Sequence, residues 1–403
     1  MIKRLVLMHL VPFFFVLGLI ILFTERVYIY AKNPPGVFKD SIKIGGILDQ
    51  TGPATIVSVP ATKAIQNYYR HINEQGGING RKIRFIVEDD RYTIPMAITA
   101  FKKLVYKDNA FLIMGPTSSS ALTALARSIQ KEKIPLISLI SPEITVNPFK
   151  RYIFIIQDIY PGQMNVLIDY ILKDLKPKKP KIGLVYPDNE SGKVDLESAL
   201  KRLKSYNLAP VTKQVLNTGG FDASSQVMNL KRYKVNHIVL PGSTAAWVLL
   251  RDLKKFGMNI PVFGSYSLCA EEVIEIVGDA AKRYYAVNAA NSWYDEGPGI
   301  AKMREITLKY HPGTEKPYRG KIYTLGWVLA MMTVEGIKRC GRGLNREVFI
   351  DKMETIKNFS TGELTGPINY SSTSHKGGST WKIFKADPST KKFIPMTGWR
   401  KSD

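Results

Sequence analysis

The sequence predicts an α/β protein with parallel sheets in two similar lobes. Short, continuous apolar strands alternate with helices along the chain, a pattern typical of parallel sheets that helices cover on both faces. This alternation starts again near residue 151, which indicates two successive sets of βα units. The length of 403 residues is also sufficient for two domains.

The first set of units begins with a β-branched strand at 42–48, which ends in the turn residues Asp49–Pro53. Apolar residues at helical spacing then predict a helix at 59–73, which Gly76 ends. The next elements are predicted on the same grounds. The strands are 82–88, 110–114 and 134–138, and the helices are 93–107 and a segment that opens at 115–120 and runs through Gln130.

The second set repeats this pattern with strands at 151–156, 181–186, 211–216, 237–240 and 261–264. Its helices are predicted at 161–175, 193–206, 223–233 and 244–256. After Gly278 the pattern changes. We predict a strand at 284–288, helices at 299–310, 318–339 and 346–355, and a closing pair of strands at 381–385 and 393–396.

Composition excludes several classes of protein. Hydrophobic residues make up 45% of the chain and charged residues 23%, which excludes a disordered or collagen-like chain. The two cysteines, Cys269 and Cys340, are too few for a disulfide-dense scaffold or a four-thiolate metal site, although they could form one bridge. The net charge of +23 is spread thinly, and we interpret it as a basic surface of a soluble domain rather than a nucleic-acid site.

Residues 1–35 are not expected to form part of the α/β fold. Lys3 and Arg4 precede the almost wholly apolar stretch Leu5–Phe23, and no cysteine for a lipid anchor lies nearby. This stretch reaches the length that spans a bilayer and is long for the core of a signal peptide. We therefore expect either a cleaved export signal or a retained membrane anchor. In both cases the rest of the chain leaves the cytoplasm.

One string combines a helix end, a double glycine and a strand start: Ile72–Ile83, INEQGGINGRKI. Shorter motifs accompany it at Thr51–Pro53, Glu88–Asp90, Gly115–Ser120, Ile134–Ser138 and Gly366–Ile368. With these motifs, the chain from Ile42 to Pro395 resembles the type I periplasmic solute-binding proteins. Within that family it is similar to the branched-chain amino acid (Leu/Ile/Val) binding proteins of ABC importers.

The resemblance implies two Rossmann-like lobes joined by a hinge of three crossover strands, with the ligand held between the lobes. The crossings are expected near 157–161, 287–293 and 364–368. Lobe 1 is then residues 42–157 plus 290–364, and lobe 2 is residues 158–289 plus 365–403. Such lobes close on a ligand and shield it from water.

The loop after the strand at 110–114 is the first candidate binding site. Ligands of open α/β sheets bind at the carboxyl ends of strands, and a hydroxyl-rich helix N-terminus favours an anion. The resemblance implies that this loop holds the ligand carboxylate through Ser118 and Ser119. The alternative is that one serine only caps the helix. The family also has a Ser-Pro-x-x-Thr segment, which implies Ser141 and Thr145, although aligning on the strand end would select Ser138 instead of Thr145.

The second lobe departs from the amino-acid binders. Ser191 stands where they have a tyrosine, and Ser265–Ser267 stands where they have a carboxylate for the ligand ammonium. Tyr266 is expected to stack on the ligand or bond to it, and Ser243 to face the cleft. A buried ammonium without a counter-charge is costly. Hence either Glu190, Glu271 or another acid replaces the missing one, or the ligand is not an ordinary α-amino acid.

No catalytic motif is present: the five histidines are scattered, and the H-E-x-x-H, G-x-S-x-G, Walker A and dinucleotide-binding patterns are absent. We interpret Asp89-Asp90 as the end of a strand rather than a metal site, and we expect no metal or cofactor. The sequence thus predicts an exported, non-enzymatic monomer that delivers an amino acid, amide, urea or carboxylate to an ABC permease and binds no nucleic acid. The alternative is a membrane-anchored ligand sensor of the same fold.

Overall fold

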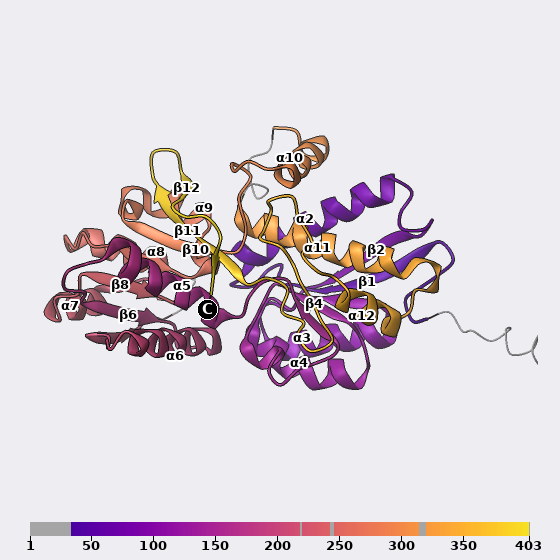
Figure 1. Ribbon diagram of the computed structural model, residues 1–403, viewed down its shortest axis with the longest axis horizontal. Helices are drawn as coiled ribbons and strands as arrows, with labels where there is room; N and C mark the ends of the chain where they lie inside the picture. Colours follow the sequence, from indigo (N-terminus) through magenta and orange to yellow (C-terminus); the bar gives the residue numbers. More distant parts are fainter. Residues whose placement is uncertain (1–33, 218–219, 242–245, 314–319, 403) are drawn as a thin grey trace, which may run out of the picture.

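The computed structural model describes residues 34–217, 220–241, 246–313 and 320–402. Figure 1 shows two α/β halves side by side, each built around its own sheet. The predicted α/β fold with two lobes is confirmed. The apolar stretch before residue 34 and Ser243 lie outside the described residues.

The first sheet has five parallel strands in the order β2-β1-β3-β4-β5. In chain order they are β1 (Ser41–Ile47), β2 (Lys82–Glu88), β3 (Leu112–Met114), β4 (Leu136–Ser138) and β5 (Ile153–Ile155). The sequence pattern predicts that a second set of units starts with the strand at 151–156, but this is wrong, because β5 pairs with β4 and completes the first sheet. Each of these strands except β2 is almost wholly buried, which explains their continuous apolar sequences.

Helices from two distant parts of the chain cover the first sheet (Figure 1). They are α2 (Thr55–Glu74), α3 (Ile94–Lys102), α4 (Ser119–Lys131), α10 (Pro298–Tyr310), α11 (Lys321–Cys340) and α12 (Arg346–Glu354). Helices α2 and α11 cross so closely at Gly326 that an added Cβ atom there would lie 2.5 Å from the Ala61 carbonyl oxygen. The rings of Tyr68 and Trp327 meet edge to face at 5.0 Å beside this crossing. The C-terminal third of the chain thus returns to the first half.

The second sheet has eight strands, with the path β12-β11-β10-β9-β8-β6-β7 and β13 paired to β11. The parallel strands are β6 (Ile182–Tyr186), β7 (Thr212–Val215), β8 (His237–Leu240), β9 (Val262–Gly264) and β10 (Tyr284–Asn288). The antiparallel strands are β11 (Thr380–Asp387), β12 (Lys392–Pro395) and β13 (Arg400–Lys401). The helices of this half are α5 (Tyr160–Asp169), α6 (Glu190–Ser205), α7 (Ser224–Arg232), α8 (Ala246–Lys255) and α9 (Glu271–Val277).

Three segments connect the halves. The chain leaves the first sheet after β5, returns after β10, and crosses again before β11. The segment before the last crossing lies along β5: the Gly377 amide donates to the Ile155 carbonyl at 2.8 Å, and so does the Tyr370 hydroxyl at 3.2 Å. We therefore propose that the third crossing lies at about 378–380 rather than at 364–368, which moves residues 365–377 from lobe 2 to lobe 1.

Asp158 lies in the first connection between the halves and contacts residues on both sides of the third. Its buried carboxylate, just after β5, accepts from the Trp381 indole nitrogen at 3.3 Å and pairs with the Lys376 ammonium at 2.9 Å. The Ser402 hydroxyl also donates to it. One acid therefore contacts the first crossing, the third crossing and the end of the chain.

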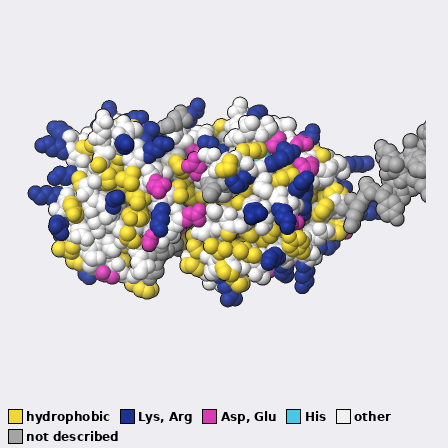
Figure 2. All heavy atoms as spheres, turned by 90° about the horizontal axis from the view of Figure 1, so that it is seen from below, with side chains coloured by type: hydrophobic (Ala, Val, Ile, Leu, Met, Phe, Trp, Pro, Cys, Tyr) yellow, Lys and Arg dark blue, Asp and Glu magenta, His cyan; other side chains and the backbone are white. Residues whose placement is uncertain are grey.

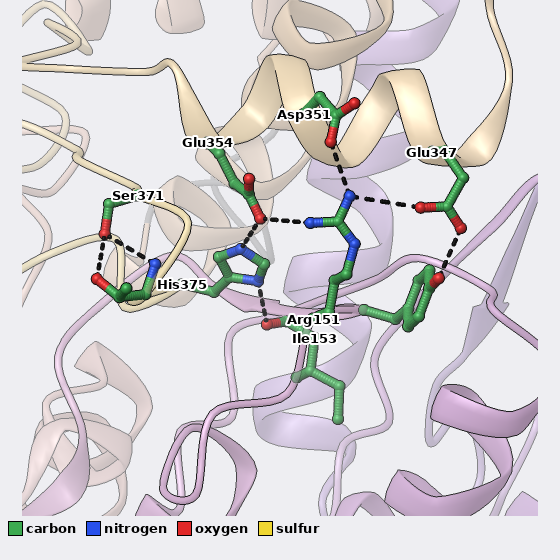
Figure 3. A network of polar contacts seen from close by, with 9 residues as sticks. Arg151, Ile153, Glu347, Asp351, Glu354, Ser371 and His375 are labelled. Carbon is green, nitrogen blue, oxygen red and sulfur yellow. Dashed lines mark hydrogen bonds and ion pairs between the residues drawn. The ribbon is translucent and has the colours of Figure 1, made fainter.

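A second polar network fixes α12 against the edge of the first sheet (Figure 3). The Arg151 guanidinium contacts Asp351 at 2.7 Å, Glu354 at 3.1 Å and Glu347 at 3.4 Å. Figure 3 shows His375 between Glu354 and β5, with its ring nitrogens 3.1 Å from Glu354 and 3.2 Å from the Ile153 carbonyl oxygen. This network joins three segments that are far apart in the sequence.

Both cysteines are free and buried, Cys269 after β9 and Cys340 at the end of α11. The bridge that the sequence left open is not formed. Burial raises the pKa of both thiols, that of Cys340 to about 11. On the face drawn in Figure 2, lysine and arginine side chains are spread over both halves. Within the described ranges, no helix is long and apolar enough to cross a bilayer.

Candidate functional site

A cavity of about 100 Å³ lies between the two halves, and both halves contribute to its wall. The first half supplies the loops that follow β1, β2, β3 and β4. The second half supplies α5, the start of α6, α8 and the segment after β9. The volume holds several water molecules, so it accommodates a small solute.

Hydrogen bonds within the first half fix the loops of this wall. The Thr117 hydroxyl accepts from the Asp49 amide at 3.0 Å and donates to the Ser58 hydroxyl at 3.0 Å. The Asp49 carboxylate accepts in turn from the amides of Gly52 and Ala54, at 2.5 and 2.7 Å. The loops after β1 and β3 are thereby locked to each other at the carboxyl edge of the sheet.

The two serines at the start of α4 have different roles. The Ser118 hydroxyl caps the helix, since it accepts from the Ala121 amide at 3.3 Å. The Ser119 hydroxyl lines the cavity and lies 2.9 Å from the Tyr160 hydroxyl on α5. The alternative of a capping serine therefore describes Ser118, and Ser119 makes a hydrogen bond between the halves.

Tyr160 and Tyr266 form the centre of the wall in the second half. Their rings stack with centroids 6.1 Å apart. The Tyr266 amide donates to the Gln163 side-chain oxygen at 2.9 Å, and the Gln163 amide group donates to Asp195 at 3.1 Å. Burial raises the pKa of both tyrosines, with a smaller contribution from the nearby Asp195 charge. Both hydroxyls are therefore neutral at physiological pH and available as donors and acceptors.

The remaining predicted residues are divided between the wall and the interior. Ser191 lines the cavity, and its hydroxyl donates to the Asn189 side chain at 3.0 Å. Ser141 and Thr145 are fully buried but do not line the cavity. The Thr145 hydroxyl donates to the Pro142 carbonyl at 2.6 Å, and Ile140 stands at the wall instead.

The two acids considered as replacements for the missing carboxylate are engaged outside the cavity wall. Glu190 accepts from the Thr123 hydroxyl on α4 at 3.0 Å, which bridges the halves. Glu271 pairs with the buried Lys321 ammonium of α11 at 3.1 Å, which bridges them at a second point. Sequence reasoning missed the acid that does line the cavity, Asp195 on α6. The available signal was its position on the buried face of that helix.

Asp49, Asp89 and Asp90 bring oxygens within 4.8 Å of one another beside this wall. Backbone amides occupy much of their accepting capacity: Asp89 accepts from the Gln50 amide at 2.8 Å and Asp90 from the Tyr92 amide at 3.0 Å. Asp89 and Asp90 directly follow β2, so the pair stands at the end of a strand, as the sequence predicts. Burial, with the charges of Asp49 and Asp89, raises the pKa of Asp90 to about 6.

The chain matches a known protein family. Residues 41–392 match the family model described as periplasmic binding protein. The chain is 23% identical over 350 residues to the Leu/Ile/Val-binding protein homolog 3 of Brucella melitensis, which covers 86% of this chain and 91% of that protein. It is 24% identical over 246 residues to the leucine-, isoleucine-, valine-, threonine-, and alanine-binding protein of Pseudomonas aeruginosa, which covers 60% of this chain and 65% of that protein.

Solved structures share the fold. A branched chain amino acid ABC transporter protein from Thermus thermophilus with bound valine superposes with a TM-score of 0.82 at 23% identity, covering 91% of this chain and 97% of that one. A fatty acid ABC transporter substrate-binding protein from Thermomonospora curvata gives a TM-score of 0.81 at 23% identity, covering 92% and 95%. Both comparisons show that the fold is shared over nearly the whole of each chain.

Proposed function

Because the chain belongs to the periplasmic binding protein family, we propose that it is the exported substrate-binding protein of an ABC importer. It captures an amino acid or a related small polar solute between its two lobes and catalyses no reaction. The observation that carries the proposal is the cavity whose wall comes from both halves, with Ser119 and Tyr160 hydrogen-bonded across it. A ligand bound there touches both lobes, so its binding free energy favours the closed form.

Among the described residues, three of the contacts between the halves belong to this closed form. Ser119 meets Tyr160 inside the cavity, and Thr123 meets Glu190 at 3.0 Å at its rim. The pair of Lys321 and Glu271 lies between α11 and α9. Opening the cleft breaks all three, which lets a solute enter or leave. The three connections between the halves are the hinge about which this movement occurs.

The proposed function also implies where the protein acts and which partner it serves. The protein acts outside the cytoplasm as a monomer and passes its solute to a membrane permease. The curated relatives named for leucine, isoleucine and valine support an amino acid as the solute. The hydroxyl and amide groups of Ser119, Ser191 and Gln163 support a polar one.

A thermal-shift panel on the purified protein tests this proposal. The panel contains amino acids, amides, urea, carboxylates and fatty acids. A ligand at about 100 times its dissociation constant adds roughly 2.7 kcal/mol to the free energy of unfolding, which produces a clear rise in Tm. We expect at least one small polar solute to raise Tm and to be recovered unchanged after incubation. A stable product formed from that solute would refute the non-enzymatic role.

A further inference from the structure

The second half has a surface that points away from the cavity. In its sheet, β6, β8, β9 and β10 run parallel, and their first residues are neighbours in the register. The start of α6 and the segment after β9 belong to the cavity wall, so the cavity lies at the carboxyl edge of these strands. The chain connections at the amino edge therefore form the outer end of the second half.

Lysine and arginine side chains gather at this outer end. It is built from the segments 178–181, 231–236, 254–261 and 278–283, in which Asp279 is the one acid. Figure 2 shows basic side chains projecting from this end of the molecule, at the left of the view. We call this surface the basic end, and its exposed cations are Lys178, Lys179, Lys181, Lys231, Arg232, Lys234, Lys254, Lys255, Lys282 and Arg283.

Polar contacts join three of the four segments directly. The Asn236 side chain accepts from the Lys181 amide at 2.8 Å and donates to the Lys179 carbonyl oxygen at 2.9 Å. The Lys231 ammonium donates to the Phe256 carbonyl oxygen at 2.6 Å, which connects the end of α7 to the end of α8. The cations of these segments thus belong to one continuous surface.

A hollow of about 400 Å³ lies in the basic end and joins the fourth segment to the others. Lys254, Lys282 and Arg283 line it together with Asp279, which lies 3.9 Å from the Lys254 ammonium. The rest of its wall is largely apolar and includes Leu253. Cations beside an apolar wall can contact both the phosphate and the glycerol part of a phospholipid headgroup.

Helix ends account for only part of this charge. Lys231 and Arg232 lie in the last turn of α7, and two lysines lie in the last turn of α8, where a cation complements the helix dipole. The cations at 178–181 and 282–283 lie outside those turns. Their mutual repulsion destabilises the folded protein, and salt screens only part of it. A partner of opposite charge would relieve this repulsion.

We propose that the basic end binds a membrane surface that contains anionic phospholipids. Clusters of about 4–8 lysine and arginine residues are typical of proteins that bind such surfaces. The inference goes beyond the proposed function, because the basic end shares no residue with the cavity wall. A nucleic acid is the other polyanion that a basic surface can bind, but the apolar wall of the hollow favours a lipid.

Binding through the basic end leaves the cavity uncovered, because the two lie at opposite edges of the second sheet. The lobes can therefore open and close while the protein stays on the membrane. Under the proposed function, this contact concentrates the protein at the membrane that holds its permease.

Vesicle binding tests this proposal on the full chain. We would measure partition coefficients on phosphatidylcholine vesicles with and without about 30% phosphatidylglycerol, at about 0.1 M and about 0.5 M salt. The readout is the ratio of the anionic to the neutral coefficient, in which contributions that do not depend on lipid charge cancel. We expect a ratio of about 100 or more at the lower salt concentration and a fall towards one at the higher.

The test variant replaces three exposed lysines of the basic end: Lys178→Gln, Lys255→Gln and Lys282→Gln. Each lysine near an anionic surface contributes about fivefold, so the ratio should fall by about 100-fold or to one. The matched control makes the same change in net charge at three exposed lysines of the first half: Lys102→Gln, Lys107→Gln and Lys131→Gln. The control should keep most of its ratio, because charges beyond the Debye length from the membrane contribute little.

Each outcome decides one question. A wild-type ratio near one would overturn the proposal, and so would an equal loss in both triple variants. Tighter binding to a DNA duplex than to anionic vesicles, at equal phosphate concentration, would overturn the lipid as partner. The three single variants, each expected to lose about fivefold, keep the test decisive if the triple variant does not fold. Solute affinity should be unchanged in every variant, so failure of membrane binding is distinguishable from failure of the proposed function.

Discussion

Replacing Glu271 with glutamine should weaken the closed conformation rather than the fold of either lobe. Glu271 lies at the start of α9 in the second half, and its partner Lys321 begins α11 in the first half. Their charged atoms are 3.1 Å apart, and the Lys321 side chain is 0% exposed. Burial lowers the pKa of Lys321, but Glu271, Cys269 and Asp295 together outweigh this effect, and the net pKa is raised. The ammonium is therefore charged in the closed form.

The expected magnitude follows from the burial of this pair. Removing one partner leaves an uncompensated buried charge, which costs about 3–5 kcal/mol. The protein can avoid most of this cost by opening, because Lys321 then reaches water. The cost therefore falls on closure, and we expect the affinity for the solute to decrease by about 100-fold or more. The free energy of unfolding without solute should change by less than about 1 kcal/mol.

Calorimetric affinity, urea unfolding and the radius of gyration from solution scattering test this reasoning. The double variant Glu271→Gln with Lys321→Met should recover much of the affinity, because methionine can pack beside the Phe384 and Phe393 rings that now lie 4.4 and 5.1 Å from the ammonium. Wild-type affinity in Glu271→Gln, together with a loss of several kcal/mol in urea, would refute the reasoning. The pair would then stabilise the fold and not closure.

Three further predictions concern other parts of the wall and the first half. Burial raises the pKa of Asp90 from 3.8 to about 6, so wild-type stability falls as pH rises from 4 to 6. Asp90→Asn should therefore stabilise the protein by up to about 3 kcal/mol at pH 7 and by nothing below pH 4. An equal effect at both pH values in thermal unfolding would contradict this. Arg151→Met leaves the largely buried Glu354 without its guanidinium partner. The free energy of unfolding in urea should fall by about 1–3 kcal/mol, and Arg151→Lys should recover little of it. A change below about 0.5 kcal/mol would show that the network in Figure 3 contributes little to stability. Ser118→Ala should lose a helix cap worth about 1 kcal/mol of stability, with unchanged affinity for the solute. Ser119→Ala should instead weaken solute binding about tenfold. The reverse result in calorimetry and urea unfolding would contradict the roles assigned to the two hydroxyls.

Local sequence patterns were sufficient for most of the fold. Buried parallel strands have continuous apolar sequences, which predicted all of the strands from β1 to β10 except β2 and β7. Strands β2 and β7 are partly exposed, and they were predicted from their place in the strand and helix alternation. The helices expected at 93–107 and 161–175 are present but end in π-helical turns, which periodicity does not reveal. The short helix α9 was missed, because it has seven residues and no side-chain cap. The place of β5 in the first sheet depends on long-range pairing.

The candidate site was predictable where it follows strand ends. Ser119 and Tyr266 each come shortly after a strand of a parallel sheet, and the structure places both at the cavity. Gln163 and Asp195 lie within helices instead, and their approach to the cavity depends on how the two halves meet. No local spacing encodes that arrangement. The sequence signal that remained was an acid on the apolar face of α6.

The two buried cysteines make the native protein nearly inert to thiol reagents. Reaction with maleimides requires a thiolate at the surface, and both thiols are shielded with a raised pKa. A cysteine introduced on each lobe can therefore carry a dye without replacing Cys269 or Cys340. Energy transfer between the two dyes would follow opening and closing of single molecules in real time, on a chain that is otherwise unmodified.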